Sequence, residues 1–186
     1  MKRTGLWVVL GIVAVLLILF GVSCGGYNGV VKKDEAVKNA WGNVQAEYQQ
    51  RSDLVPNLVN TVKGAANFEQ QTLENVIKAR AQATSVQINP DDLNQENMAK
   101  FQQAQGQLSG ALSRLLVTVE QYPQLQAVAG FRQLQTQLEG IENGIKDARK
   151  KYNDAVNTYN VSIRSFPMLM FRGMFGFKVR PNFEAD

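Results

Sequence analysis

The stretch Tyr152-Asn-Asp-Ala-Val-Asn-Thr-Tyr-Asn160 decides the fold, because it lies inside the longest periodic segment of the chain. Residues at alternating gaps of three and four form one stripe on a helix. The stripe consists of Phe131, Leu134, Leu138, Ile141, Ile145, Ala148, Tyr152, Ala155, Tyr159, Ser162 and Phe166. At 1.5 Å per residue this helix would be about 53 Å long. It cannot bury such a stripe against itself, so other segments must pack along it.

Two further segments carry stripes of the same period. The first consists of Val30, Asp34, Val37, Trp41, Val44, Tyr48, Arg51, Val55, Leu58 and Val62, and the second of Met98, Phe101, Gln105, Leu108, Leu112, Leu115, Val119 and Tyr122. A shorter helix is expected at 67–86, with a loop around Pro90. The chain lacks β-rich runs, so the pattern predicts an all-α fold. Residues 27–166 are expected to form an elongated antiparallel four-helix bundle.

The chain begins with an apolar segment. Gly5 to Val22 contains 18 residues without a charge. A membrane-spanning helix needs about 20 apolar residues, whereas the core of a cleaved signal has about 7–15. The length therefore predicts an N-terminal transmembrane helix, with residues 1–26 as the membrane anchor. Lys2 and Arg3 place the N-terminus in the cytoplasm and the body outside it, as in a single-pass protein of the bacterial inner membrane.

Cys24 follows the apolar segment and precedes two glycines. One interpretation is lipoprotein processing, which would make Cys24 a lipid anchor. The other is an unmodified cysteine at the end of a helix. Both interpretations tether the body to a membrane.

The composition excludes several classes of protein. The chain has no His and one Cys, which excludes most metal sites, Cys/His or Ser/His catalysis and an internal disulfide. The net charge is only +4, and no basic cluster in the body alternates with aromatic residues. Nucleic-acid binding is therefore not expected, and the chain is expected not to be an enzyme.

Residues 167–186 form an apolar and basic tail. Between Arg164 and Arg180 there are four basic residues and no acidic one, together with many Phe and Met residues. An antiparallel bundle of four helices returns its last helix to the membrane face. The tail is then expected either to contact the membrane or a partner, or to close the end of the bundle.

Eight polar residues are candidates for a buried network between the helices. They are Arg51, Asp53, Arg80, Glu120, Glu142, Arg149, Asn153 and Asn160. Buried charges of this kind usually fix the register between helices. A catalytic carboxylate pair is conceivable, but no motif supports one. Tyr152-Asn153 and Tyr159-Asn160 repeat at seven residues, so their amides can bridge to another helix, to a second subunit or to a ligand.

The order and spacing of many short motifs resemble the LemA family. They are Tyr27-Asn28, Trp41, Arg51-Ser-Asp-Leu-Val-Pro-Asn-Leu-Val59, Thr61-Val-Lys-Gly64, Ala79-Arg80, Glu120-Gln-Tyr-Pro123, Glu142-Asn143, Arg149, Tyr152-Asn-Asp-Ala-Val156, Tyr159-Asn160 and Phe166-Pro167. The resemblance implies a single-pass bacterial membrane protein with a long helical bundle, no established enzymatic activity and no cofactor. It also implies a link to membrane remodelling or to membrane proteases. Asn67-Phe68 and Cys24 depart from the family pattern.

The sequence thus predicts a membrane-anchored helical scaffold or interaction protein. It is expected to form homo-oligomers or to present its helices to a membrane-protein partner. The alternative is an extracytoplasmic sensor or ligand-binding bundle, with a cavity lined by Asn153, Asn157 and Asn160.

Overall fold

In the computed structural model, the backbone is described for residues 2–64 and 68–184, and the side chains for residues 7, 10–13, 25–64 and 68–184. All regular elements in this part are helical, which confirms the all-α prediction. They are α1 (Lys2–Lys63), α2 (Gln70–Ser85), the 3-10 turn η1 (Pro90–Asp92), α3 (Gln95–Val119), α4 (Pro123–Gln126), α5 (Ala129–Arg164) and α6 (Met168–Phe171).

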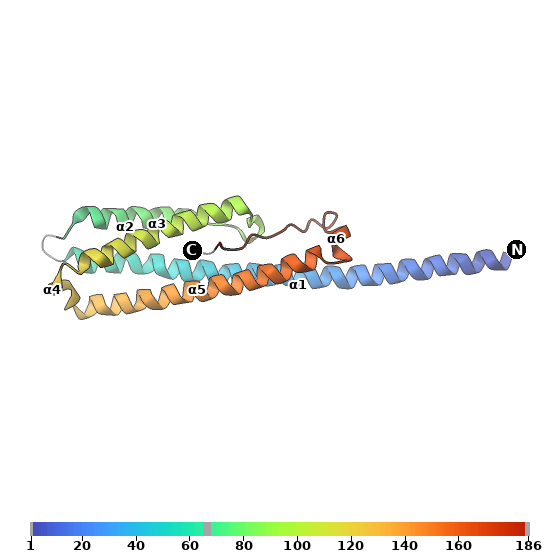
Figure 1. Ribbon diagram of the computed structural model, residues 1–186, viewed down its shortest axis with the longest axis horizontal. Helices are drawn as coiled ribbons and strands as arrows, with labels where there is room; N and C mark the ends of the chain where they lie inside the picture. Colours follow the sequence, from blue (N-terminus) through green and yellow to red (C-terminus); the bar gives the residue numbers. More distant parts are fainter. Residues whose placement is uncertain (1, 65–67, 185–186) are drawn as a thin grey trace.

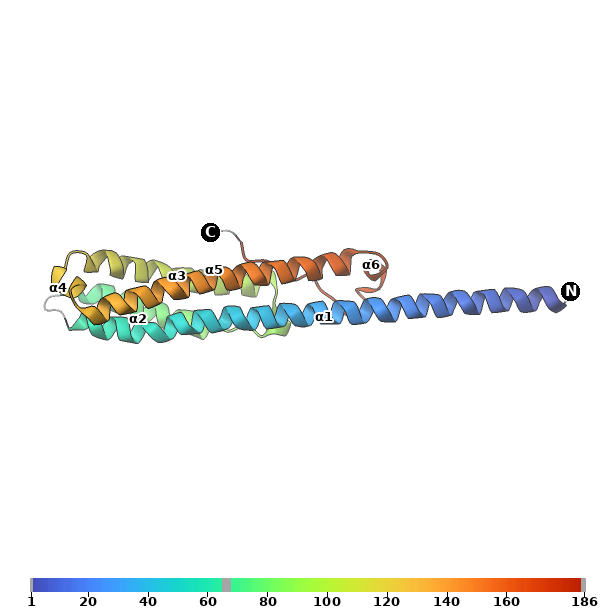
Figure 2. The same cartoon turned by 90° about the horizontal axis from the view of Figure 1, so that it is seen from below.

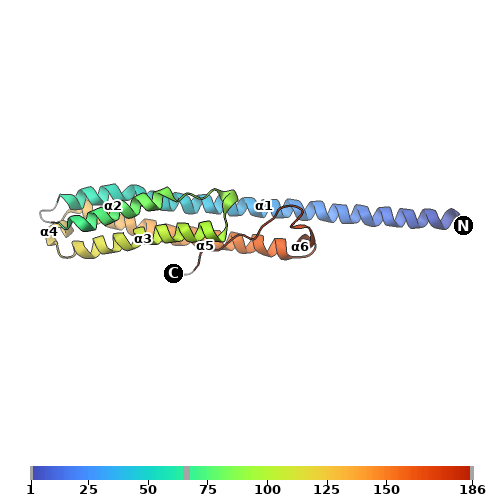
Figure 3. The same cartoon turned by 90° about the horizontal axis from the view of Figure 1, so that it is seen from above.

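The architecture is an elongated set of helices that lie lengthwise beside one another (Figure 1). α1 and α5 run antiparallel and pack along most of the length of α5, as Figure 2 also shows. α2 and α3 form a second antiparallel pair, which covers only the half of α1 and α5 that lies away from the N-terminus (Figure 3). The N-terminal part of α1 projects beyond all other elements (Figure 1).

The core is divided into two parts because the α2–α3 pair is shorter than the α1–α5 pair. In the far half, Leu58, Val76 and Leu108 represent a cluster to which α1, α2, α3 and α5 all contribute. In the half nearer the N-terminus, α1 and α5 pack with Phe101 at the start of α3, with residues of the 86–94 loop, and with Phe183 of the tail. The tail therefore covers a part of the α1–α5 pair that lies beyond most of the α2–α3 pair.

The predicted stripe of α1 is confirmed, since all of its apolar residues and Arg51 are buried. The predicted stripe of α5 is wrong at its C-terminal end. Val156 and Ile163 are buried there, and Phe166 is 82% exposed. The buried positions step by four twice between Ala148 and Val156, and a second step of four rotates the stripe out of the heptad pattern. In α2, Ala79 is buried and Ile77 is exposed.

The tail turns back after α6 and runs along the bundle as an extended segment, residues 177–184 (Figure 1). The reversal occurs at residues 172–177, where the N–H of Phe177 donates to the carbonyl of Arg172 at 2.9 Å. Gly176 has a φ of +74°, a conformation that favours glycine. Met168 and Phe183 of the tail join the core, as expected of a tail that closes the bundle. Other apolar residues of the tail are exposed, and their contact with a membrane or a partner stays a prediction.

Among the described residues, no helix combines the length and the hydropathy of a membrane-spanning segment. Most of the predicted anchor, residues 1–26, lies outside the described side chains, and so does Cys24. The described side chains in this segment include Trp7, Leu10, Ile12 and Val13, and all four are exposed.

Candidate functional site

The largest polar site is the surface of α5 around Tyr152, Asn153 and Asn160 that binds the tail, and we call this surface the groove. The amide of Asn160 accepts from the N–H of Arg180 at 2.9 Å and donates to its carbonyl at 2.8 Å. Asn153 binds Phe183 in the same way, at 2.8 Å and 3.2 Å. The two asparagines lie one heptad apart on the same face of α5. Their amides bond to the N–H and carbonyl groups of the extended tail, as the main chain of a neighbouring strand would.

Side chains of the tail reinforce this main-chain pairing. The hydroxyl of Tyr152 donates to the carbonyl of Pro181 at 3.0 Å. The ring of Phe183 stacks on Trp41, with 6.0 Å between the ring centroids, and meets the edge of Tyr152 at 5.4 Å. Arg149 places its guanidinium 4.9 Å from the centre of the Phe183 ring. The groove therefore recognises both the main chain and the aromatic side chain of the tail.

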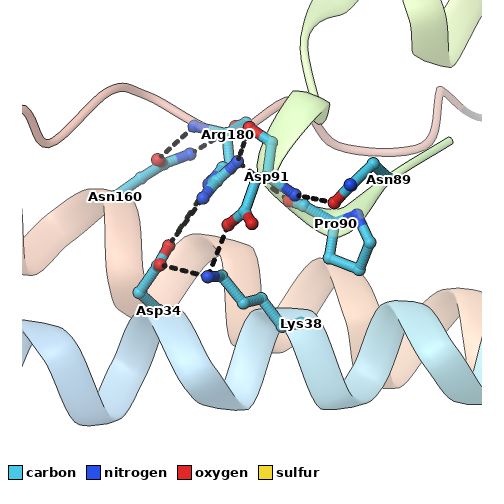
Figure 4. Close-up of polar contacts among 7 residues, drawn as sticks. All are labelled: Asp34, Lys38, Asn89, Pro90, Asp91, Asn160 and Arg180. Carbon is cyan, nitrogen blue, oxygen red and sulfur yellow. Dashed lines mark hydrogen bonds and ion pairs between the residues drawn. The ribbon is translucent and has the colours of Figure 1, made fainter.

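Arg180 joins three elements at one point (Figure 4). Its guanidinium forms an ion pair with Asp34 of α1 at 3.0 Å. It also donates to the carbonyls of Pro90 and Asp91 in η1, at 3.1 Å and 3.3 Å. The backbone of the same residue is held by Asn160 of α5. Arg180 thus connects α1, η1 and α5.

Lys38 completes this group, because its ammonium lies between Asp34 and Asp91 (Figure 4). The pKa of Lys38 is raised, mainly by its hydrogen bond to Asp91. The same bond lowers the pKa of the Asp91 carboxyl.

We expect an NMR titration to place the pKa of Asp91 below its ordinary value of 3.8, and the variant Lys38→Met to return it towards that value. A lowered carboxyl pKa favours the folded state at neutral pH, and this contribution is lost as the pH falls through the lowered value. Glu96 serves as the control, since Lys100 lowers its pKa independently and Lys38→Met should leave it unchanged. An Asp91 pKa that is the same in both proteins would contradict the ion pair.

Two tyrosines of the groove are protected from ionisation. Burial raises the pKa of Tyr152 far above its ordinary value, against the opposing charge of Arg180. Burial also raises the pKa of Tyr159, and Asp34 adds to this effect. Both hydroxyls therefore stay neutral at physiological pH and act as hydrogen-bonding groups.

A second polar cluster surrounds Arg51 in the middle of the bundle. Arg51 is 1% exposed, and its guanidinium donates to Ser109 at 2.6 Å and to Glu142 at 3.0 Å. It also donates to the side-chain oxygen of Gln105 at 2.8 Å. The amide nitrogen of Gln105 in turn donates to the carbonyl of Ala83 at 3.2 Å. Through these bonds Arg51 of α1 is linked to α3, α5 and α2, which fixes the register of the helices.

The eight predicted network residues do not form a single group. Arg51 and Glu142 lie together in one cluster, and Arg149, Asn153 and Asn160 lie along the tail. Arg80 is half-buried and donates from Nε to the carbonyl of Ser52 at 2.7 Å. Asp53 and Glu120 are exposed, which corrects their predicted burial. Asp53 accepts from Gln49 on its own helix, so the carboxylate partner of Arg51 is Glu142 rather than Asp53.

The position of the predicted ligand cavity is occupied by the chain itself. The amides of Asn153 and Asn160 are bonded to the tail, and Asn157 accepts from the side chain of Asn182 at 3.0 Å. This arrangement counts against a ligand between these residues. Within the described part of the chain, no three His, Cys, Asp or Glu residues are grouped as metal ligands would be.

Arg180 and Phe183 are the two residues of the tail whose role in the site the sequence pattern did not indicate. Each belongs to an extended segment without helical periodicity. The signal available in the sequence is the seven-residue interval between Asn153 and Asn160, and the tail that pairs with them runs antiparallel to α5.

The fold and the groove define a class of protein: an all-helical body with a long N-terminal helix, held together by internal polar clusters. The LemA family model matches residues 40–186, and the chain belongs to the LemA family.

Curated relatives carry two names. The chain is similar to magnetosome protein MamQ 2 of Paramagnetospirillum magneticum, with 27% identity over 175 residues that cover 85% of this chain and 64% of the relative. It is 26% identical to magnetosome protein MamQ of Magnetospirillum gryphiswaldense, over 82% of this chain and 62% of the relative. It is 24% identical to protein LemA of Metamycoplasma hominis, over 80% of this chain and 64% of the relative. The chain therefore spans somewhat less than two thirds of these relatives.

Proposed function

We propose that this protein is a non-enzymatic scaffold of LemA type, anchored in the bacterial inner membrane by a single N-terminal helix. Its body, an elongated antiparallel four-helix bundle, stands outside the cytoplasm and presents helix surfaces to other proteins. Acylation of Cys24 is the alternative mode of anchoring.

The observation that carries this proposal is the continuity of α1. A single helix runs from Lys2 to Lys63 and contains both the apolar segment and the first stripe of the core. An anchor built in this way holds the body at a fixed angle, because no flexible linker separates the two. The Arg51 cluster supports the same role, since it fixes four helices in one register.

The proposed partners are further copies of the chain or another membrane protein, including a membrane protease. The similarity to relatives that are named magnetosome protein MamQ supports a role of this chain as a component of a larger cellular structure. On the outer faces of α2 and α3, Ile77 and Val117 are 52% and 60% exposed, and they offer apolar contacts to such a partner.

The test is photo-crosslinking of the full chain in intact cells. A photoreactive residue at Ile77 or Val117 is expected to give a crosslink to a second copy or to a membrane protein, identified by mass spectrometry. The control position is Gln133, an exposed polar residue of α5. Monomer alone at both apolar positions would contradict the scaffold. The intact mass of the purified protein decides the anchor, because retention of residues 1–23 excludes lipoprotein processing.

A further inference from the structure

The segment around α6 exposes large apolar side chains in one place. We call residues 166–176 the hydrophobic turn. Phe166, Met170 and Met174 in this turn are 82%, 71% and 80% exposed, and Leu169 is 49% exposed. A group of exposed apolar residues of this size on a folded body marks a surface that contacts something else.

The hydrophobic turn is held in a fixed position on the body. Met168 is 4% exposed, and its Cε lies 3.4 Å from the point that a Cβ on Gly26 would occupy. The ring of Phe175 meets the ring of Tyr27 at 5.0 Å between centroids. The exposed side chains around these contacts are therefore presented by a folded structure.

The hydrophobic turn lies next to the end of the apolar segment. Gly26 and Tyr27 follow Val22, the last residue of the uncharged segment, by about one turn of helix. Figures 1 and 2 show α6 beside α1 at the place where α1 leaves the other helices. When the apolar segment is embedded in a bilayer, the turn consequently lies at the level of the lipid headgroups.

The two segments that flank the hydrophobic turn carry only positive charges, and the first acidic residues beyond them on α1 are Asp34 and Glu35. Residues 25–33 and 155–179 contain no Asp or Glu, and their cationic residues are Lys32, Lys33, Arg164, Arg172 and Lys178. The nearest acidic residue of α1, Asp34, is paired with Arg180 and Lys38. Such a surface is complementary to anionic phospholipids.

We propose that the hydrophobic turn inserts into the headgroup region of the bilayer and forms a second membrane contact beside α1. This inference rests on the anchoring in the proposed function. A second copy of the chain fits the surface less well, because a twofold contact through the turn would bring two sets of cations together without a carboxylate. With two contacts, the body could not rotate freely about α1, and its outer helices would face fixed directions.

The experiment uses the full chain in liposomes of phosphatidylcholine and phosphatidylglycerol. A single fluorescent label is placed at Met170→Cys in a Cys24→Ser background, and lipids brominated in the acyl chain act as quenchers. The control label is at Gln121→Cys, an exposed residue at the opposite end of the bundle. We expect several-fold stronger quenching at position 170 than at position 121.

A protein that floats with the liposomes but shows equal, weak quenching at both positions would overturn the inference and leave the anchor intact. A protein that does not float would overturn the anchor and the inference with it. Crosslinking between two copies at position 170 without lipid quenching would assign the surface to an oligomer instead.

The charge contribution is tested by Arg172→Glu combined with Lys178→Glu. Neither side chain lies in the core, so the thermal melting temperature of the body should stay the same. Quenching at position 170 should fall at least twofold in anionic liposomes. Unchanged quenching in this variant would overturn the role assigned to the cations.

Discussion

Replacement of Arg51 by alanine is expected to lower the free energy of unfolding of the body by about 3 kcal/mol, because it removes the charged centre of a buried cluster. The substitution deletes hydrogen bonds to Ser109, Glu142 and Gln105 at once. It leaves the buried side-chain oxygen of Gln105 without its donor, and it opens a cavity between the helices. Chemical denaturation followed by circular dichroism measures this loss.

The matched control is Arg51→Met, which keeps the apolar stem and fills most of the cavity. We expect the free energy of unfolding to fall about half as much in this variant as in Arg51→Ala, because Glu142 is 37% exposed and can turn towards water. Nε of Arg51 also has no hydrogen-bond partner, so burial of the guanidinium already carries a penalty that methionine avoids. Equal losses in the two variants would show that the polar cluster alone, rather than packing of the side-chain stem, stabilises this site.

The helices were predictable because their burial is periodic in the sequence. In α1 the steps of four and three from Val30 to Val62 pick out the buried positions, including Trp41 and Arg51. The same rule failed near the end of α5. There Val156 is fully buried and Ala155 only partly, so the core gains the larger apolar side chain when the stripe rotates by one position.

In the site where the tail binds α5, the sequence indicated the helix residues but not their partners in the tail. Asn153 and Asn160 stand out by their seven-residue interval, but no pattern in the sequence names the main chain of residues 180–183 as their partner. Glu142 likewise lies 91 residues from Arg51, and any carboxylate on a facing helix could have filled that role. Pairing between distant segments depends on how the chain folds back, and local periodicity does not encode it.

Replacement of Phe183 by alanine is expected to destabilise the body by about 3 kcal/mol, the loss typical of a phenylalanine removed from a core. Phe183 is 5% exposed and packs against Trp41, Phe101 and Tyr152. These contacts fill the half of the core nearer the N-terminus, to which the α2–α3 pair contributes only the start of α3. Loss of the ring should also release the tail, and faster hydrogen exchange at the N–H of residue 183 would report this release.

The matched control is Phe166→Ala, the same change in a residue that is 82% exposed. A change in the free energy of unfolding within about 0.5 kcal/mol is expected for it, as for most surface substitutions. The two variants separate two functions of one tail. Phe183 holds the tail in the groove, whereas Phe166 belongs to the surface that we assign to the membrane. A similar loss of stability in both variants would mean that the whole tail, and not the Phe183 pocket, supports the core.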